Sequence, residues 1–217
     1  MPAAVPIKPQ YGPTLGQLLS PRWRAASPRV RAAVIAGIGG LAILALLAVL
    51  TFENAHYSHG GSVPFSFSYR GLYRVPADPG GYVKVASRGA DGRPQDSFAV
   101  EPLRLPPYSG GLSGEVPLYA SRLIEGLSRS DPEFMLRGEG KTRVNGVPAY
   151  NILYTEVLEG QLLYGRNVLL LPERQGAREG VQIVMLSSPS ARPRVRMASE
   201  VASAGVLSRP LKSFTIG

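Results

Sequence analysis

The chain of 217 residues carries 24 Lys and Arg against 15 Asp and Glu, for a net charge of +9, and it contains no cysteine. The lack of cysteine excludes disulfides, thiolate metal sites, a cysteine nucleophile and a lipobox-type lipid anchor. The first 31 residues hold five of the basic side chains and no acidic one. More than half of the net charge therefore belongs to a short tail, which argues against a nucleic-acid partner.

Residues 1–31 form this basic tail. Six prolines argue against a packed core and predict a disordered segment in the cytoplasm. Trp23, between Arg22 and Arg24, suits a membrane interface, with the indole among the headgroups and the guanidinium groups on lipid phosphates. Two interpretations stay open: a docking motif for a cytoplasmic partner, and a plain tail that flanks an anchor.

Residues 32–52 read AAVIAGIGGLAILALLAVLTF, which is 21 residues without a charge. As a helix with a rise of about 1.5 Å per residue, this stretch would cross a hydrocarbon core of about 30 Å. The four arginines just before it place the amino terminus in the cytoplasm and the carboxyl terminus outside. A cleaved signal peptide is the alternative, but its apolar core is usually shorter, so we predict an uncleaved signal-anchor.

Small residues recur in the first half of this stretch, at Ala33, Ala36, Gly37 and Gly40. They satisfy the small-x-x-x-small pattern, which lets two helix backbones approach closely, so they predict a homodimer formed through the helix. Small residues are also common in membrane helices that do not pair. Leucine at positions 37 and 40 is expected to weaken self-association in a membrane reporter, and unchanged association would contradict the pairing.

Residues 53–64 are polar and contain glycine, so they predict a linker between the anchor and a domain over residues 65–217. The linker holds the two histidines of the chain, His56 and His59. A metal site needs further ligands that are held rigidly, so neither a metal nor another cofactor is expected.

The first half of the domain is predicted to contain strands and one helix. Alternating apolar and polar residues indicate a strand at 65–69, continued by 72–75, and further strands at 82–87 and 97–105, the last interrupted by Pro102. Apolar residues spaced by three and four indicate a one-faced helix over 116–129 that lies against a sheet.

The second half is predicted to be an antiparallel meander followed by a helix. Asn145-Gly146 suits a type I′ turn between strands at 134–144 and 147–158. Strands at 162–171 and 181–186, a helix over 191–207 and an edge strand at 213–216 complete the pattern. This order indicates an α+β domain whose helices pack on an antiparallel sheet.

Three stretches within residues 65–216 resemble a known family: RVNGVPAY at 143–150, RNV at 166–168 and LKSF at 211–214. With the order of elements, they resemble the PsbP-like α/β/α sandwich domains, which are often exported or lipid-anchored in bacteria. The early Pro-x-Gly-Trp segment of that family is absent, and Pro79-Gly80-Gly81-Tyr82 is the stretch that could stand in its place. These motifs belong to turns and strands, so the resemblance implies a fold and barely a function.

No catalytic motif is visible. Both histidines lie in the predicted linker, which argues against Ser/His chemistry, and the sequence contains no G-x-S-x-G, P-loop or G-x-G-x-x-G motif. Five arginines would form a basic patch for anionic lipid, a polyanion or an acidic partner if they lie together, and otherwise they are solvated. They are Arg174, Arg178, Arg192, Arg194 and Arg196.

The sequence thus predicts a single-pass protein of the cell membrane with an extracytoplasmic α+β domain. The favoured function is a non-enzymatic binding or assembly module with a protein partner. A small-molecule or lipid-binding domain with a groove between sheet and helix is the alternative, and an enzyme of unfamiliar type is the least favoured. A deep apolar pocket would favour the carrier, whereas a flat surface would favour assembly.

Overall fold

The computed structural model describes residues 27–51, 54–89, 91–106, 112–173, 177–191 and 193–217. Within these ranges the side chains of residues 31, 44–51, 112 and 113 are not described. The chain forms two compact units, residues 1–53 and 54–217.

The first unit contains helix α2 (Pro28–Thr51), which confirms the predicted helical conformation up to Thr51. Its described apolar side chains are exposed in several directions around the axis, with exposed fractions of 61% for Ile35, 69% for Leu41 and 59% for Ile43. Across the side chains that the structure describes, none of the helices is both long and apolar enough to cross a membrane.

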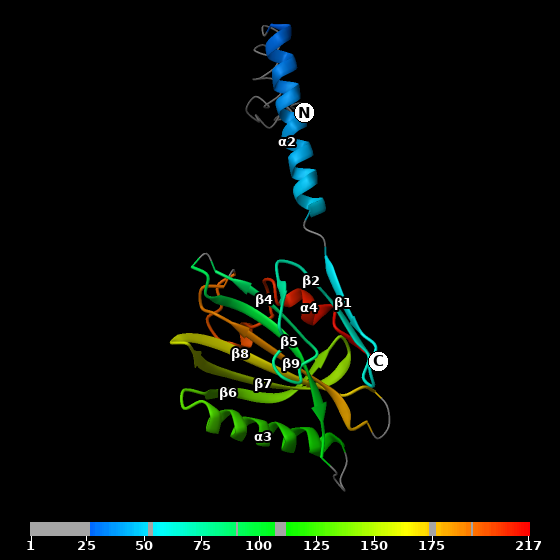
Figure 1. The fold of residues 1–217 in the computed structure, drawn as a ribbon, viewed down its shortest axis with the longest axis vertical. Coiled ribbons are helices and arrows are strands. Elements are labelled where there is room, and N and C mark those ends of the chain that lie inside the picture. Colours follow the sequence, from blue (N-terminus) through cyan, green and yellow to red (C-terminus); the bar gives the residue numbers. More distant parts are fainter. Residues whose placement is uncertain (1–26, 52–53, 90, 107–111, 174–176, 192) are drawn as a thin grey trace, which may run out of the picture. The chain divides into compact units, whose positions relative to one another are not determined.

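The second unit is built on a sheet of seven strands, all paired antiparallel in the order β3-β4-β5-β9-β8-β7-β6 (Figure 1). The strands are β3 (Tyr73–Val75), β4 (Val83–Arg88), β5 (Pro94–Arg104), β6 (Met135–Val144), β7 (Val147–Leu158), β8 (Gln161–Leu170) and β9 (Glu179–Ser187). The sequence of strands from β6 to β9 is the predicted meander, which is confirmed.

Two tight turns set the register of this meander. Asn145 has a φ of 50° and Gly146 a φ of 90°, the left-handed pair that a type I′ turn requires. Glu159 and Gly160 repeat the arrangement with φ values of 52° and 73°. Each turn joins strands whose end residues are direct partners, so neither hairpin can slip by one residue without turning its core side chains to the solvent.

Pro102 does not interrupt β5, contrary to the prediction. The strand continues through Pro102, which pairs with Val181 of β9. Val100 accepts a hydrogen bond from the amide of Tyr82, so the amides of alternate residues, including position 102, face the β4 side of the strand. β4 begins only at Val83, opposite Val100, and therefore needs no donor at position 102.

A second sheet of three strands has the order β1-β2-β10, with β1 (Ala55–His59), β2 (Phe65–Tyr69) and β10 (Thr215–Ile216). The predicted linker over residues 53–64 is therefore wrong for much of its length. The segment AHYSH alternates like a strand, and its ring at Tyr57 packs against Phe65 and Phe67 at centroid distances of 5.9 and 5.6 Å.

The predicted continuation of β2 through residues 72–75 is also wrong. Gly71 has a φ of 73°, which turns the chain after Tyr69. Leu72 is buried, and β3 then pairs with β4 as an edge of the large sheet. Consecutive strands thus belong to different sheets.

The large sheet separates two apolar cores. On one face, helix α3 (Leu112–Ser130) packs on β6 and β7, which confirms the helix predicted over 116–129 (Figure 1). Its buried partners are Leu103, Leu105, Phe134, Ile152, Tyr154 and Leu169. On the opposite face lies a larger core that joins the small sheet to β4, β5, β8 and β9, with Phe67, Phe98 and Phe214 among its buried rings.

The helix predicted over residues 191–207 is wrong. The described part of this segment contains only the 3₁₀ helix η1 (Ala198–Glu200), and helix α4 (Ser208–Lys212) begins after it. Ala202 and Gly205 have φ values of 62° and 72°, which no α-helix accommodates. Ala198, Val201 and Ala202 of this segment are nevertheless buried.

The fold is therefore α+β with antiparallel sheets. Its layers differ from an α/β/α sandwich on one side, because the face opposite α3 is covered by the small sheet, η1 and α4 together. Arg166 of β8 joins η1 to the large sheet, because its guanidinium donates to the carbonyl of Val201 at 3.1 Å and to Asn151 Oδ1 at 2.9 Å.

Candidate functional site

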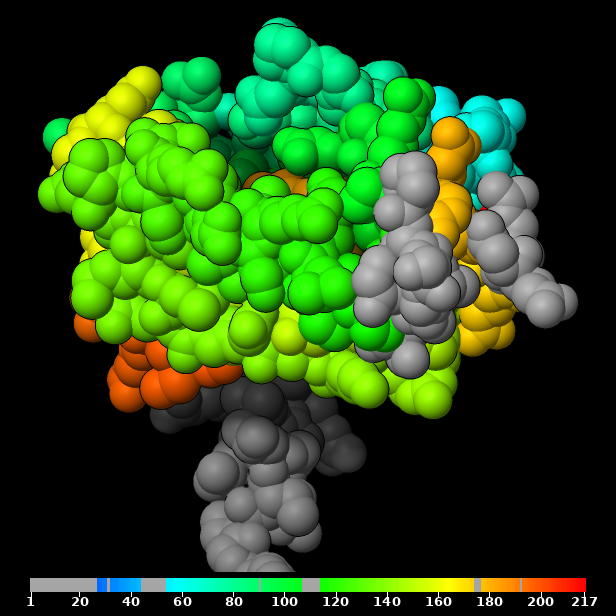
Figure 2. Space-filling model, turned by 90° about the horizontal axis from the view of Figure 1, so that it is seen from below, coloured from blue at the N-terminus to red at the C-terminus, as the bar shows by residue number. Residues whose placement is uncertain are grey.

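A groove lies on the α3 face of the large sheet, where α3 leaves β3, β4 and the start of β5 uncovered. We call it the sheet groove; its volume is about 220 Å³. It is lined by Tyr73, Val75, Pro76, Lys84, Ala86, Ser87, Arg88, Pro94, Gln95, Asp96, Ser97, Leu158, Leu163 and Leu186. Figure 2 shows this face hollowed between the teal atoms of the β3 region and the green atoms of α3.

The floor and rim of the sheet groove are mainly apolar. Leu163 is buried and Leu186 half-buried, and both come from central strands of the sheet. At the rim, Leu158 is 49% exposed and Tyr73 is 44% exposed. Large apolar side chains that stay exposed beside a concave floor mark a surface suited to an apolar partner group.

The charged groups of the sheet groove are already engaged with protein partners. Lys84 Nζ lies 2.9 Å from an Asp78 carboxylate oxygen, and Arg88 Nε donates to the hydroxyl of Tyr73 at 2.8 Å. Burial raises the pKa of the nearby Glu101 carboxyl, as does the charge of Asp78, whereas Lys84 lowers it. These pairs support the walls and leave the apolar floor as the surface that a partner can contact.

The size of the sheet groove restricts its occupant. Pockets for drug-sized molecules usually measure about 300–1,000 Å³ and bury most of the ligand. The sheet groove, at about 220 Å³, is smaller and open to one side. It fits one or two large apolar side chains that project from a partner better than it fits an enclosed ligand.

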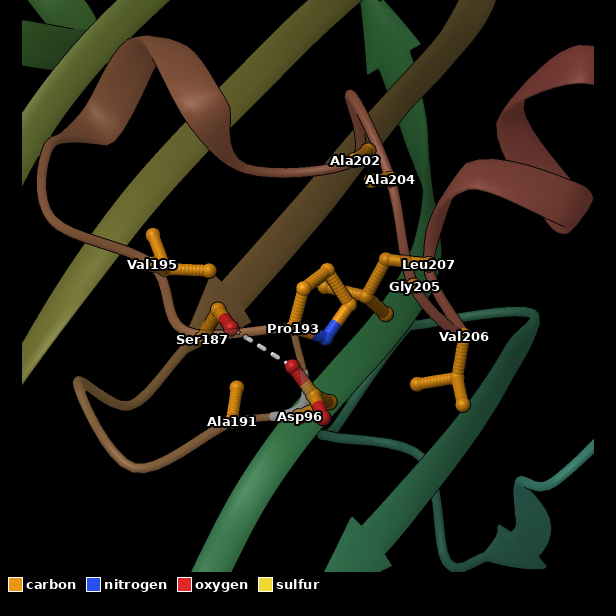
Figure 3. Close-up of a pocket in the computed structure, with 10 residues that line it drawn as sticks. All are labelled: Asp96, Ser187, Ala191, Pro193, Val195, Ala202, Ala204, Gly205, Val206 and Leu207. Atoms are coloured by element: carbon orange, nitrogen blue, oxygen red, sulfur yellow. Dashed lines mark hydrogen bonds between the residues drawn. The ribbon is translucent and has the colours of Figure 1, made fainter.

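Asp96 is a buried carboxyl that borders both the sheet groove and a small cavity behind it (Figure 3). The cavity measures about 10 Å³, and its other lining residues are uncharged. Ser187 donates to Asp96 Oδ1 at 2.6 Å, and Ser87 donates to Oδ2 at 3.2 Å. Burial raises the pKa of Asp96, and these two hydrogen bonds offset part of that effect.

The raised pKa of Asp96 predicts a pH dependence of stability. The folded chain holds the proton more tightly than the unfolded chain, whose pKa is near 3.9, so the free energy of unfolding falls as pH rises from about 4 through the folded pKa and then levels off. Asp96→Asn should remove the part of this fall that Asp96 contributes and should stabilise the domain at neutral pH, whereas Glu101 and Glu156, whose pKa values burial also raises, keep their own parts. Urea unfolding across this range measures the effect.

Two further variants complete this test. Asp96→Ala leaves both serine hydroxyls without an acceptor and is expected to cost about 1–3 kcal/mol. Asp91→Asn, at an exposed position, should keep the wild-type pH profile. Parallel profiles for wild type and Asp96→Asn would contradict the assignment.

The described part of the chain does not gather the arginines that the sequence singled out. Arg178 lies just before β9, where it contacts Glu115 Oε1 of α3 at 2.9 Å. Arg194 and Arg196 come after the opposite end of β9, beside a shallow surface depression that also includes Glu200. Because nine residues of strand separate the two places by about 25 Å, Arg178 is not part of a shared patch with Arg194 and Arg196. Arg174 and Arg192 lie outside the described residues.

The two histidines belong to β1 and lie on opposite faces of it, because they are three residues apart in a strand. His56 Nδ1 lies 3.3 Å from the Ser68 hydroxyl, whereas His59 stacks on Phe65 with a centroid distance of 5.1 Å. Among the described residues, no group of three His, Asp or Glu side chains could hold a metal ion.

The residues predicted for the membrane region remain untested. Arg22, Trp23 and Arg24 lie outside the described residues. Ala33, Ala36, Gly37 and Gly40 are exposed on α2, and a Cβ built at either glycine meets nothing within 4 Å, so the helix surface there is open for a second helix.

The sequence did not reveal the sheet groove, because its lining residues come from several strands and form no motif. Asp96 did carry a usable signal. It shares a strand face with Phe98 and Val100, both fully buried, so strand alternation alone places a carboxyl in the core.

A search against family models and a search of curated proteins both return no match. Solved structures do match the domain, which is an antiparallel α+β module with a groove on its helix-bearing face. Cyanobacterial PsbP (CyanoP) from Synechocystis has a TM-score of 0.52 at 14% identity, over 76% of this chain and 94% of that chain. The domain has a PsbP-like fold, as the sequence motifs predicted.

Two further structures match with lower scores. LpqN of Mycobacterium tuberculosis, described as involved in cell envelope biogenesis, has a TM-score of 0.49 at 11% identity, over 75% of this chain and 90% of that chain. The Ran-binding protein Mog1p of Saccharomyces cerevisiae has a TM-score of 0.46 at 13% identity, over 76% of this chain and 95% of that chain.

Proposed function

We propose that the chain is a membrane-anchored module that binds or assembles with another protein outside the cytoplasm and does not catalyse a reaction. The sheet groove is the observation that carries this proposal. Its apolar floor, its exposed rim at Leu158 and Tyr73 and its volume of about 220 Å³ suit apolar side chains of a protein partner. The charged groups on its walls are engaged in pairs and are not poised around an open reaction site.

The anchor is part of the same proposal and rests on the sequence. Residues 32–52 carry no charge, and arginines precede them, so we place the tail in the cytoplasm and the domain outside, with one crossing of the cell membrane. The apolar side chains exposed around α2 support this, because a helix that is apolar all round is found in a protein core or in a membrane.

A small apolar molecule or a lipid chain is the second candidate for the sheet groove. Leu163 and Leu186 would serve such a ligand as an apolar floor. The limited volume favours the protein partner.

Photocrosslinking separates these candidates. Leu158 at the groove rim and Leu118 on α3 are matched probes, because their exposed fractions are 49% and 48% and only Leu158 lines the groove. With benzoylphenylalanine at either position of the full chain in its membrane, position 158 should give an adduct with one defined protein. Leu158→Arg should weaken the affinity for that protein about tenfold or more, and Leu118→Arg should not.

The outcomes are distinct. Equal adducts from both positions, or an unchanged affinity after Leu158→Arg, would contradict a protein partner in the sheet groove. A co-purified small molecule that Leu158→Arg displaces would favour the second candidate. If an alkaline wash removes the unmodified chain from membranes, the anchor is contradicted, but the protein partner in the sheet groove is not.

A further inference from the structure

We propose that one end of the domain binds anionic phospholipid headgroups through Arg70, Arg74, Arg209 and Lys212, which we call the tether-side basic surface. The inference rests on the proposed anchor. It goes beyond the sheet groove, because it concerns another part of the domain and another kind of partner.

The chain enters the domain close to this surface. β1 begins at Ala55, only three residues after Phe52, so at most about 11 Å of extended chain separates the two residues. Ala55 is the direct partner of Tyr69 on β2, and Arg70 follows Tyr69. If the apolar stretch crosses the membrane up to Phe52, the covalent path alone keeps Arg70 near the headgroups.

Helix α4 adds its own cations beside Arg70. The Ser213 hydroxyl accepts a hydrogen bond from the amide of Ser68 at 2.9 Å and lies within hydrogen-bond distance of the carbonyls of Ser68 and Arg209, at 3.1 and 2.9 Å, which ties the end of α4 to β2. A Cβ at Gly71 would lie 3.2 Å from Val206, so the turn after β2 also contacts the segment before α4. These contacts bring Arg209 close to the Arg70 turn.

Arg74 extends the surface over β1. Its guanidinium carbon lies 5.1 Å from the centroid of the Tyr57 ring. Arg70, Arg74, Arg209 and Lys212 are all exposed. A cation that rests on an aromatic face keeps its charge and can still meet a phosphate.

The two stretches of the domain that supply these four cations contain no acidic residue, and Glu53, Asp78 and Glu200 flank them. Residues 54–77 and 201–217, which supply β1, β2, β3, α4 and β10, contain four Lys and Arg and no Asp or Glu. The rest of the domain is nearly balanced, with 15 basic and 14 acidic residues. Most of the net positive charge of the domain therefore comes from these two stretches, and this asymmetry is complementary to an anionic lipid surface.

The short tether favours a lipid partner over a partner that lies farther from the membrane. Electrostatic attraction to a membrane falls off over about 10 Å at an ionic strength of 0.1 M. If the apolar stretch ends its crossing at Phe52, the tether of at most about 11 Å keeps the start of β1 close to the headgroups, and a tethered contact forms without a loss of translational freedom.

The test uses the full chain in lipid nanodiscs, with a fluorophore on one introduced cysteine, which the cysteine-free sequence makes unambiguous. Ser203→Cys reports from the acid-free segment before α4, and Ser62→Cys reports from the opposite end of the β1–β2 hairpin; both serines are exposed. Quenching by headgroup-labelled lipid is compared in phosphatidylcholine discs with and without phosphatidylglycerol.

We expect phosphatidylglycerol to increase quenching at position 203 by about twofold or more at an ionic strength near 0.1 M, and high salt to remove the increase. Arg209→Glu with Lys212→Glu should abolish it. Arg122→Glu with Lys141→Glu, an equal change of charge at exposed positions on α3 and β6, should preserve it. Position 62 should show little response.

The inference would be overturned, with the anchor intact, if quenching does not depend on lipid charge or if both double variants reduce it equally. Failure of the chain to remain in the discs would instead overturn the anchor, and with it this inference. The inference would also be overturned if the wild-type surface binds an acidic protein in discs without anionic lipid and quenching does not respond to phosphatidylglycerol. In that case the partner is the acidic protein and not the lipid.

Discussion

Gly165→Ala should destabilise the domain by about 3 kcal/mol or more. Gly165 of β8 is the direct partner of Tyr154 on β7, and the Tyr154 ring lies over it. A Cβ at position 165 would come within 2.3 Å of two ring carbons. The ring cannot move aside, because it is fully buried, stacks on Phe134 at 5.2 Å and donates to Asn167 at 3.2 Å. Overpacking of this kind is costly because the core must shift or the side chain must leave its rotamer.

Gly140→Ala is the matched control for this variant. Gly140 lies in β6, in the same sheet, and a Cβ there meets nothing within 4 Å. Its replacement should be neutral or slightly stabilising, by about 0.5 kcal/mol, because alanine loses less conformational entropy on folding. Urea unfolding of both variants measures the difference, and equal midpoints would contradict the account of Gly165.

Phe67→Ala should cost about 3–5 kcal/mol, the range for removal of a fully buried ring. Phe67 is fully buried, and its ring lies 4.9 Å from Phe98 of the large sheet and 6.1 Å from Phe214 of the segment before β10. It therefore holds the small sheet against the large sheet. Since the ring of Tyr57 on β1 packs against Phe67 at a centroid distance of 5.6 Å, the variant should also loosen the first strand of the domain.

Calorimetry and amide hydrogen exchange test the Phe67 variant. The thermal midpoint should fall, and protection should be lost first in β1, β2 and β10. Tyr73→Ala removes an exposed aromatic ring of comparable size from β3 and should change the free energy of unfolding by less than about 1 kcal/mol. A loss below about 1 kcal/mol for Phe67→Ala would show that other contacts hold the small sheet.

Local chemistry made parts of the fold predictable. The pair Asn145-Gly146 strongly favours a type I′ turn, so these two residues were enough to predict the hairpin and the register of its strands. α3 was predictable because its apolar residues recur on one face and it begins and ends in polar segments. In both cases a short segment contains all the information needed.

The errors arose where the outcome depends on distant partners. Ala198, Val201 and Ala202 have the spacing of a helix. They are buried without forming an α-helix, because the segment contains only η1 and has positive φ values. β1 is a strand because β2 pairs with it, and the sequence HYSH is too short and too polar to show this by itself. The sheet groove exists because α3 stops short of β3 and β4, which no local pattern encodes.

The pairing of β2 with β10 has a consequence for the order in which the domain folds. Ser66 and Thr215, whose hydroxyls lie 2.8 Å apart, are separated by 149 residues of sequence. Closing so long a loop is slow compared with forming the hairpins of the meander. The hairpins of the meander, and the local hairpin of β1 and β2, can therefore form before β10 pairs with β2 and completes the small sheet.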